Sequence, residues 1–382
     1  MPRGRRALAP DVDIRRATGG RAMPEISMRR ALIAVALVIV LIVALVLPLG
    51  SVPAPSAQPS APLPIKIGYQ AVASWLLFGA RSLKLYEKAG LAPTFVKFTA
   101  GAPMIAAAQS QSIDVAMVGT VPFLAGVASG VDWVYIGVDN EYPRAVGFVA
   151  RKDSGVGSLS DLSGKTIGFF RGSTSHYAVL TVLKRQGIAT SQVKLLQLEP
   201  AQQVAAMMNR QIDVAATWEP WMQKMIHQAD GTIVAREADI GLYTGLGVWA
   251  VRSTWLKANP ETARRYLRAL VMAYDALEKD PAPAINAVMQ EMGIPEDWAR
   301  AIFKEAGLPA IYKQTDPGYR YSAVKDSSLQ ASLADLARFL FEEKVLPRQV
   351  EVSGLVDGSL MAEVLATHKT GMSPGGGGST TR

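Results

Sequence analysis

The stretch Ile65-Lys-Ile-Gly-Tyr-Gln70 returns with small changes as Lys165-Thr-Ile-Gly-Phe-Phe170. Both stretches are short and rich in residues that favour strands. Their glycines, Gly68 and Gly168, lie 100 residues apart. The match predicts a duplicated unit that begins at each of these strands.

The likeness continues through the residues that follow each strand. Leu83-Lys-Leu-Tyr-Glu-Lys-Ala-Gly90 and Leu180-Thr-Val-Leu-Lys-Arg-Gln-Gly187 are both typical of a helix end closed by glycine. Farther along, residues 104–116 match residues 204–215, and both segments end in Ile-Asp-Val-Ala. Each unit follows the order strand, helix, strand, helix, strand. This order predicts two parallel-sheet lobes of the same design.

Two aspartates, Asp114 and Asp213, occupy equivalent positions of the two units. Ligand contacts need not match between the halves of a binding site, whereas contacts that build a repeated fold must. We therefore assign both carboxylates to structure. Two similar extended runs, at 146–151 and 247–252, are expected near the places where the chain enters and leaves the second lobe.

The predicted fold is α/β, with two similar lobes around a cleft and extra helices on the first lobe. Amphipathic spacing predicts helices at 262–277 and 329–344, which would pack back on that lobe. The predicted boundaries are 65–146 for the first part of lobe 1, 147–246 for lobe 2, and 247–370 for the return strand and C-terminal helices of lobe 1.

The N-terminal region predicts export. Residues 1–30 carry eight arginines against three acidic residues, so +5 of the net charge of +8 lies in this basic cytoplasmic segment. Residues 31–49 form a signal or transmembrane segment that is long enough to span a bilayer. Because the positive charge precedes it, the bulk of the chain is expected on the periplasmic side. Whether this segment is cleaved or kept as an inner-membrane anchor stays open.

Residues 50–64 are predicted to form a linker rich in Pro, Ala and Ser, and residues 371–382 are predicted to be a disordered tail.

The composition of the chain excludes several classes of function. The remaining charge of about +3 does not favour a nucleic-acid partner. Cysteine is absent, which excludes disulfides, thiol nucleophiles and thiolate metal sites. With three histidines and no nucleophile–base pair, we expect no catalytic residue, metal or cofactor.

Parallel sheets bind ligands beyond the carboxyl ends of their strands. Four loops are expected there, at residues 70–75, 119–122, 172–177 and 218–221. Two of these loops open helices, whose unpaired N–H groups suit a small oxyanion. Asp139, Glu141 and Arg144 are expected near the first crossing and are candidates to line the cleft, although the default expectation for them is solvation in a loop.

The helix that opens with Ser173-Thr-Ser-His176 has more hydroxyls than a cap requires. An ordinary N-cap is one interpretation, and an anion site formed by Ser173 and Thr174 is the other. His176 in the first turn would be held neutral by the positive helix end, as a hydrogen-bonding group at the site or as a supporting residue.

The second unit also ends in an aromatic stretch, Trp218-Glu-Pro-Trp221. Trp218 at a strand end is suited to stack on a ligand or cover its carbon chain, and Glu219 beside it is suited to hold a cation. The alternatives are that Trp218 packs in a lobe core and that Glu219 is solvated.

At these residues the chain resembles the substrate-binding proteins of ABC importers for taurine, aliphatic sulfonates and nitrate. The resemblance extends from about Ile65 to Leu256. The segments that carry it are Tyr69-Gln70, Gly119-Thr-Val-Pro122, Asp161-Leu-Ser-Gly-Lys-Thr-Ile-Gly168, Ser173-Thr-Ser-His-Tyr177, and Trp218 with Pro220.

The resemblance implies a type II periplasmic binding protein that captures taurine or an alkanesulfonate between its lobes. It would deliver this ligand to ABC permease and ATPase subunits. Nitrate or another small organic anion, and a role as a membrane-tethered sensor, are the alternatives. Related pyrimidine-precursor synthases use a Cys-rich motif, which this chain lacks.

By motif, the ligand-binding candidates are Gln70, Thr120, Ser173, Thr174, His176 and Trp218, with Glu219 as a source of negative charge. The taurine branch tends to have an acidic residue before the Val-Trp of the returning strand. This chain has Gly247 at that position. Either Glu219 takes over the charge, or the ligand lacks an amine.

Overall fold

The structure, a computed structural model, describes residue 33 and residues 61–141, 143–242 and 245–369. Apart from Ile33, the predicted segments 1–30 and 31–49 lie outside these residues, as do most of the linker and the tail at 371–382. Within the part that is described, no helix has both the length and the apolar character to cross a membrane. The chain divides into units 1–59 and 60–382, and the second unit is described below.

The first lobe is built on a five-stranded sheet with the order β2-β1-β3-β10-β4. Strands β2 and β3 run parallel to β1, whereas β10 is antiparallel to β3 and β4. Strand β1 begins two residues before the predicted start of the lobe. The strands are β1 (Leu63–Gln70), β2 (Leu91–Phe98), β3 (Val115–Gly119), β4 (Trp133–Glu141) and β10 (Leu246–Arg252).

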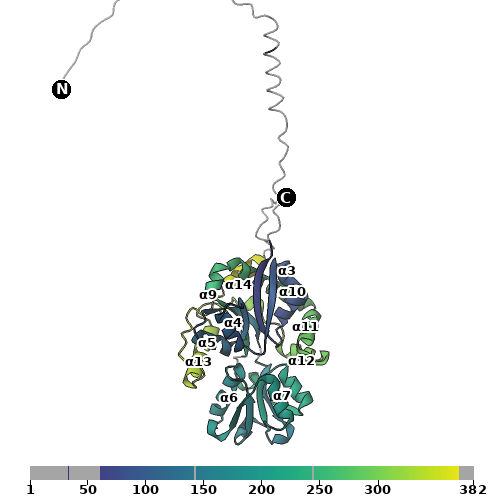
Figure 1. The fold of residues 1–382 in the computed structure, drawn as a ribbon, viewed down its shortest axis with the longest axis vertical. Helices are drawn as coiled ribbons and strands as arrows, with labels where there is room; N and C mark the ends of the chain where they lie inside the picture. Colours follow the sequence, from purple (N-terminus) through teal and green to yellow (C-terminus); the bar gives the residue numbers. More distant parts are fainter. Residues whose placement is uncertain (1–32, 34–60, 142, 243–244, 370–382) are drawn as a thin grey trace, which may run out of the picture. The chain divides into compact units, whose positions relative to one another are not determined.

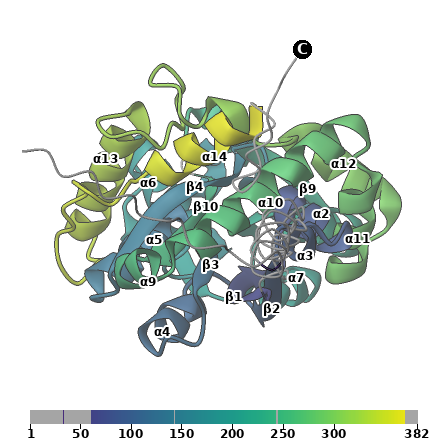
Figure 2. The same cartoon turned by 90° about the horizontal axis from the view of Figure 1, so that it is seen from above.

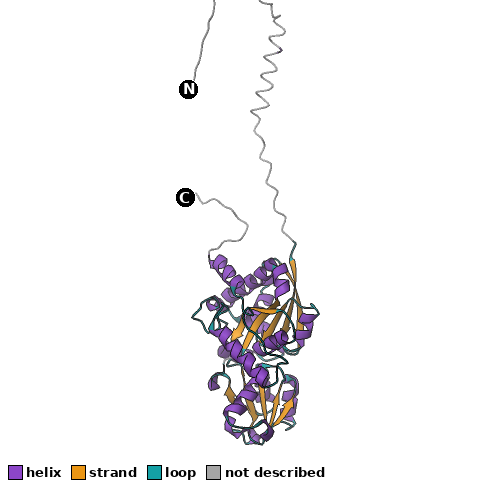
Figure 3. Cartoon of the chain, turned by 90° about the vertical axis from the view of Figure 1, so that its left-hand side faces the viewer, coloured by secondary structure: helices purple, strands orange, loops and turns teal. Residues whose placement is uncertain are grey.

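The second lobe repeats this plan in the order β7-β6-β8-β5-β9. Here β6 is parallel to β7 and β8, and β5 is antiparallel to β8 and β9. Figure 3 shows the strands of the two sheets in separate lobes. The strands are β5 (Val146–Arg151), β6 (Thr166–Phe169), β7 (Lys194–Gln197), β8 (Val214–Trp218) and β9 (Gly231–Arg236).

The two predicted α/β lobes are confirmed, but the prediction of parallel sheets needs a correction, because each described sheet also contains an antiparallel strand. Strand β4 ends at the edge of lobe 1 that faces lobe 2, and the chain then crosses over. Strand β5 therefore starts at the facing edge of lobe 2 and runs away from it, opposite to its neighbours. Strand β10 does the same on the return. These strands begin at Val146 and Leu246, each one residue before the predicted boundary.

Packing explains the glycine at the repeated position in both lobes, Gly68 and Gly168. A Cβ atom added to Gly68 would lie 2.9 Å from the Cδ1 atom of Ile113. A Cβ atom added to Gly168 would lie 2.9 Å from the Cδ1 atom of Ile212. In each lobe an isoleucine from the turn just before the neighbouring parallel strand (β3 or β8) fills the space over the glycine, and a side chain at the glycine position would collide with it.

The repeated aspartates also have one structural role. Asp114 Oδ2 accepts a hydrogen bond from the backbone N–H of Lys66 at 2.8 Å. Asp213 Oδ2 accepts one from the N–H of Thr166 at 2.9 Å. Each carboxylate ties the start of a parallel strand to its neighbour, as the assignment to structure predicted.

Helices cover both faces of each sheet, and Figure 2 shows this for lobe 1. On one face α2, α10 and α11 share a core with Trp249 and Tyr266, and on the other α5 and α13 pack around Phe123. The predicted helix at 262–277 lies within α10, and the one predicted at 329–344 matches α13 but extends two residues past its end at Glu342. The helices are α2 (Trp75–Ser82), α3 (Leu85–Lys88), α4 (Pro103–Gln109), α5 (Thr120–Ala128), α6 (Thr174–Arg185), α7 (Pro200–Met208), α8 (Trp221–Gln228), α9 (Ser253–Ala258), α10 (Pro260–Lys279), α11 (Ala282–Met292), α12 (Glu296–Ala306), α13 (Ser328–Glu342) and α14 (Ser359–Lys369).

Candidate ligand site between the lobes

A cavity lies where residues of both lobes meet, at the carboxyl ends of β1, β3 and β8. About 550 Å³ of it is not filled by atoms, and part of this space is open to solvent. The inner volume available to the centres of water-sized molecules is about 40 Å³. One water needs about 10–15 Å³ by this measure, so the inner part admits a few waters or a small ligand.

The lining is mostly apolar, with a small number of polar groups. The glycines in it let the backbone approach a ligand closely. The apolar residues are Val72, Ala102, Met117, Pro122, Ala145, Val146, Trp218 and Leu246, the glycines are Gly101, Gly119, Gly172, Gly245 and Gly247, and the polar residues are Gln70, Asn140, Ser173, Thr174 and Glu219.

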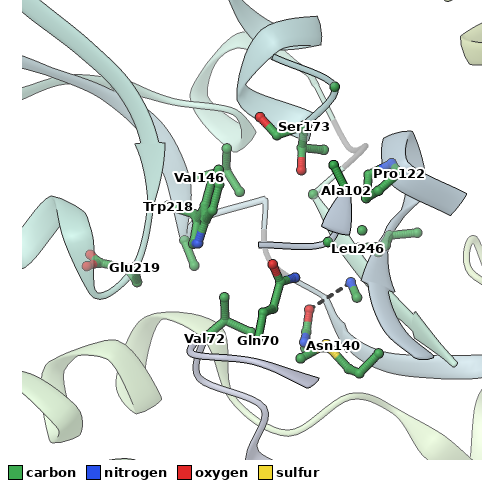
Figure 4. A pocket seen from close by; sticks show the side chains of 18 residues that line it. Gln70, Val72, Ala102, Pro122, Asn140, Val146, Ser173, Trp218, Glu219 and Leu246 are labelled. Atoms are coloured by element: carbon green, nitrogen blue, oxygen red, sulfur yellow. Dashed lines mark hydrogen bonds between the residues drawn. The ribbon is translucent and has the colours of Figure 1, made fainter. Parts of the chain in front are cut away.

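All four predicted loops contribute to this cavity. Gln70 ends β1, Gly119 ends β3, Thr174 begins α6 and Trp218 ends β8, and each of them lines the space. Figure 4 shows the side chains of Gln70 and Ser173 on different sides of the cavity, with Trp218 beside Val146. The lining thus combines an amide, hydroxyls and an aromatic ring from both lobes.

The N-termini of α5 and α6 face each other across the cleft. Gly119 precedes α5 and Ser173 is the N-cap of α6. A Cβ atom on Gly119 would lie 3.3 Å from the Oγ1 atom of Thr174, so the two helix starts are close together. Both helix dipoles have their positive ends here, and both ends have backbone N–H groups without helical partners. The electrostatic field therefore favours a small anion.

Ser173 is engaged in holding its own turn. Its hydroxyl donates to the carbonyl oxygen of Phe170 at 2.7 Å and accepts from the N–H of His176 at 3.4 Å. This is the ordinary N-cap role. Thr174 is the next residue, and no hydrogen bond of its hydroxyl is recorded among the described residues. Thr174 is therefore the more available hydroxyl for a ligand.

His176 lies outside the lining residues. Its side chain is buried, its ring stacks on Phe169 with centroids 4.8 Å apart, and Nδ1 accepts from the N–H of Gly172 at 3.4 Å. Burial, with a smaller contribution from Arg171, lowers its pKa to about 4, so the ring is neutral at pH 7. His176 supports the turn before α6, which is the second of the two roles considered for it.

Thr120, the first residue of α5, is likewise buried and does not line the cavity. Its neighbours Gly119 and Pro122 do. The motif is therefore at the cavity, but Thr120 itself is not one of the lining residues.

Glu219 lines the cavity, but its carboxylate faces α8. In Figure 4 the carboxylate lies beyond Trp218 and points away from Gln70. Its oxygens accept from the backbone N–H of Gln223 at 3.1 Å and from the Nε2 atom of Gln223 at 3.2 Å. Burial raises its pKa to about 7. This carboxylate serves the first turn of α8, so the predicted cation-binding role does not fit its orientation.

Asn140, in β4, is a lining residue that sequence reasoning missed. Its Oδ1 accepts from the N–H of Gly247 at 2.8 Å, and its Nδ2 donates to Asp139 Oδ2 at 2.7 Å. Asp139 in turn accepts from Ser74 Oγ at 2.8 Å and from Trp249 Nε1 at 3.0 Å. Burial raises the pKa of Asp139 to about 6. The sequence marked this segment as near the cleft, but it did not single out the asparagine.

The model of the NMT1-like family matches residues 58–292 of this chain. This segment includes both sheets, the four loops and Asn140, and it is more than half of the chain.

Individual relatives extend the comparison. The alkanesulfonate-binding protein SsuA from Xanthomonas axonopodis pv. citri, bound to MOPS, is 26% identical with a TM-score of 0.65, over 80% of this chain and 98% of that one. The taurine-binding periplasmic protein of Escherichia coli is 23% identical, over 74% of this chain and 88% of its own length. The desulfurization enzyme DszB shares the fold: the structure of its C27S mutant has a TM-score of 0.61 and 15% identity, over 80% of this chain and 100% of that one.

Proposed function

The chain belongs to the NMT1-like family, and from this premise we propose that it is the substrate-binding protein of an ABC importer. It captures a small sulfonate between its lobes and delivers it to a membrane permease with its ATPase. The observation that carries the proposal is the pair of helix starts that meet at a cavity of matching size. Relatives named for alkanesulfonates and taurine support the ligand class.

Each part of a sulfonate has a suitable partner in the cavity. The negative oxygens suit the N–H groups of α5 and α6, together with the hydroxyl of Thr174 and the amide of Gln70. The carbon chain suits the apolar wall of Trp218, Val146 and Leu246. We assign ligand binding to Gln70, Thr174 and Trp218 directly, and to Ser173 through the turn that it caps.

Binding rather than catalysis fits the groups at the site. Among the described residues that line the cavity, Glu219 is the one ionisable side chain, and its carboxylate faces α8. The likeness to DszB is a likeness of fold. Mass spectrometry of a sulfonate recovered after incubation tests this point: the compound is expected unchanged, and a new product would make the protein an enzyme.

The N-terminal segment supports export of the binding lobes from the cytoplasm. Export to the periplasm agrees with the periplasmic relative. If residues 31–49 are retained, they tether the binding lobes near the permease and raise the local concentration there. Fractionation of cells distinguishes cleavage from retention of residues 31–49. A protein that has lost this segment appears in the periplasmic fraction, whereas a protein that keeps it appears in the membrane fraction.

Isothermal titration with ethanesulfonate, taurine, nitrate and sulfate tests the ligand class. At least one sulfonate is expected to bind with a Kd of roughly 1 μM or below, about −8 kcal/mol. If nitrate binds most tightly of the four, the ligand is assigned as nitrate instead of a sulfonate. A protein that is folded by circular dichroism and binds none of the four would overturn the proposal. Mass spectrometry of the small molecule that copurifies with the protein gives an independent answer.

A further inference from the structure

We infer that Asn140, seated against Gly247, makes the cavity select sulfonates with an uncharged tail and reject those that carry an ammonium group. The inference rests on the proposed function and identifies the residues that set its specificity. Two observations support it. A side chain at position 247 would overlap with Asn140, and the surrounding carboxylates already accept hydrogen bonds from other groups of the protein.

Asn140 occupies the space that a side chain at position 247 would need. A Cβ atom on Gly247 would lie 2.6 Å from Asn140 Oδ1 and 2.7 Å from its Cγ. Both distances are too short for real contacts. Any larger residue at position 247 therefore displaces Asn140 from the wall, so the identities of the two residues are coupled.

The amide of Asn140 is fixed in orientation. Its Oδ1 accepts from the backbone N–H of Gly247, and Figure 4 shows this bond at the edge of the cavity. One N–H of Nδ2 donates to Asp139, which is itself held by Ser74 and Trp249. The second N–H of Nδ2 is a donor that suits a sulfonate oxygen. A neutral amide at this point offers no charge to an ammonium group.

The carboxylates near the cavity are committed elsewhere. Asp139 is fully buried behind Asn140 and accepts three hydrogen bonds. Glu219 faces α8 through Gln223. Glu141 accepts from the N–H of Ala310 at 3.0 Å and from the hydroxyl of Tyr319. An ammonium group that entered the cavity would lose its water without gaining an anion, a strongly unfavourable exchange.

Ethanesulfonate and taurine test this inference directly, because they share the sulfonate and differ by the amine on the tail. For the wild-type protein, titration calorimetry is expected to give at least tenfold tighter binding of ethanesulfonate. Equal affinities, or tighter binding of taurine, would overturn the inference while leaving the proposed function intact. Binding of neither compound would instead count against the proposed function.

Two variants test the residue pair. Asn140→Ala removes the amide and adds no charge, so ethanesulfonate is expected to bind about tenfold more weakly while taurine stays weak. The double variant Asn140→Ala/Gly247→Glu places a carboxylate in the space that Asn140 leaves. The ratio of the affinity for taurine to the affinity for ethanesulfonate is expected to rise tenfold or more. An unchanged ethanesulfonate affinity in Asn140→Ala would remove Asn140 from the site. This single variant decides the point even if the double variant does not fold.

Discussion

Trp218 is the aromatic residue in the apolar lining of the cavity. It ends β8, is 9% exposed, and lines the cavity beside Val146. Trp218→Ala is expected to raise the Kd for a sulfonate at least tenfold, because the ligand loses its apolar cover. Titration calorimetry measures the change. Trp255→Ala is the control, since Trp255 packs partly buried on lobe 1 and does not line the cavity. Equal affinities in both variants would show that Trp218 acts only in packing.

Glu219 makes the stability of the fold depend on pH. Burial raises its pKa to about 7 from 4.5, so the folded state holds a proton that the unfolded state releases between these values. Its contribution to the free energy of unfolding is full below pH 4.5 and is lost as the pH rises through 7. Urea titrations of the wild type and Glu219→Gln measure the difference between them. From pH 5 to pH 8 the wild type is expected to lose about 2 kcal/mol relative to the variant. A constant difference would mean that Glu219 stays ionised.

Local sequence patterns predicted the cavity-lining residues that lie at strand ends or helix starts. They did not predict whether a residue lines the cavity when this depends on the orientation of its side chain or on pairing with a distant strand. Gln70, Thr174 and Trp218 each lie where a strand ends or a helix starts. His176 does not line the cavity, because its ring stacks on Phe169 in the core of lobe 2. Asn140 had no local signal, because the pairing of β4 with β10 brings it beside Gly247, 107 residues away.

At the scale of the strand, the glycine–isoleucine contact gives a test of the repeat. Gly168→Ala puts a methyl group 2.9 Å from the Cδ1 atom of Ile212, which overpacks lobe 2. The expected loss in the free energy of unfolding is about 1–3 kcal/mol. Ile212→Val removes the Cδ1 atom, so in the double variant it is expected to restore part of this loss. Urea unfolding measures the coupling.

The same pair in lobe 1, Gly68→Ala with Ile113→Val, is the matched experiment. Because the distance is again 2.9 Å, coupling of the same sign is expected. Strictly additive effects in both lobes would mean that the isoleucines move aside without cost, and the packing reason for the repeated glycines would then be wrong.

The order of helices and strands could be predicted because the same sequence pattern occurs in both lobes. The direction of β5 and β10 was not, since an extended run has no sequence mark for running parallel or antiparallel. Direction is set by where the chain crosses: a strand that enters a lobe at the cleft must run away from it. The fold class was thus predictable, and the mixed character of the sheets came from the connections.

At the scale of the whole molecule, helices of lobe 1 contact lobe 2 in two places, through α13 on one side and through α11 and α12 on the other (Figure 1). On one side, the rings of Phe339 in α13 and Tyr177 in α6 form a T-shaped pair with their centroids 5.1 Å apart. On the other, His227 in α8 stacks on Trp298 in α12 at 4.3 Å, and Lys224 Nζ donates to the carbonyl oxygen of Met292 at 3.2 Å. These contacts join the two lobes, so they stabilise the arrangement in which the cavity is formed, and the proposed ligand would bind to that arrangement.

Phe339→Ala is therefore expected to weaken ligand binding without touching the ligand. The aromatic pair and the ammonium of Lys184, 5.4 Å from the ring centroid of Phe339, together contribute on the order of 1 kcal/mol to closure. The affinity is expected to fall by roughly fivefold, mostly through faster dissociation in stopped-flow measurements. Phe341→Ala is the control from the same helix, because Phe341 is 41% exposed and lies outside these contacts. If both variants release ligand at the wild-type rate, α13 does not take part in closure, and the affinity must come from the cavity wall alone.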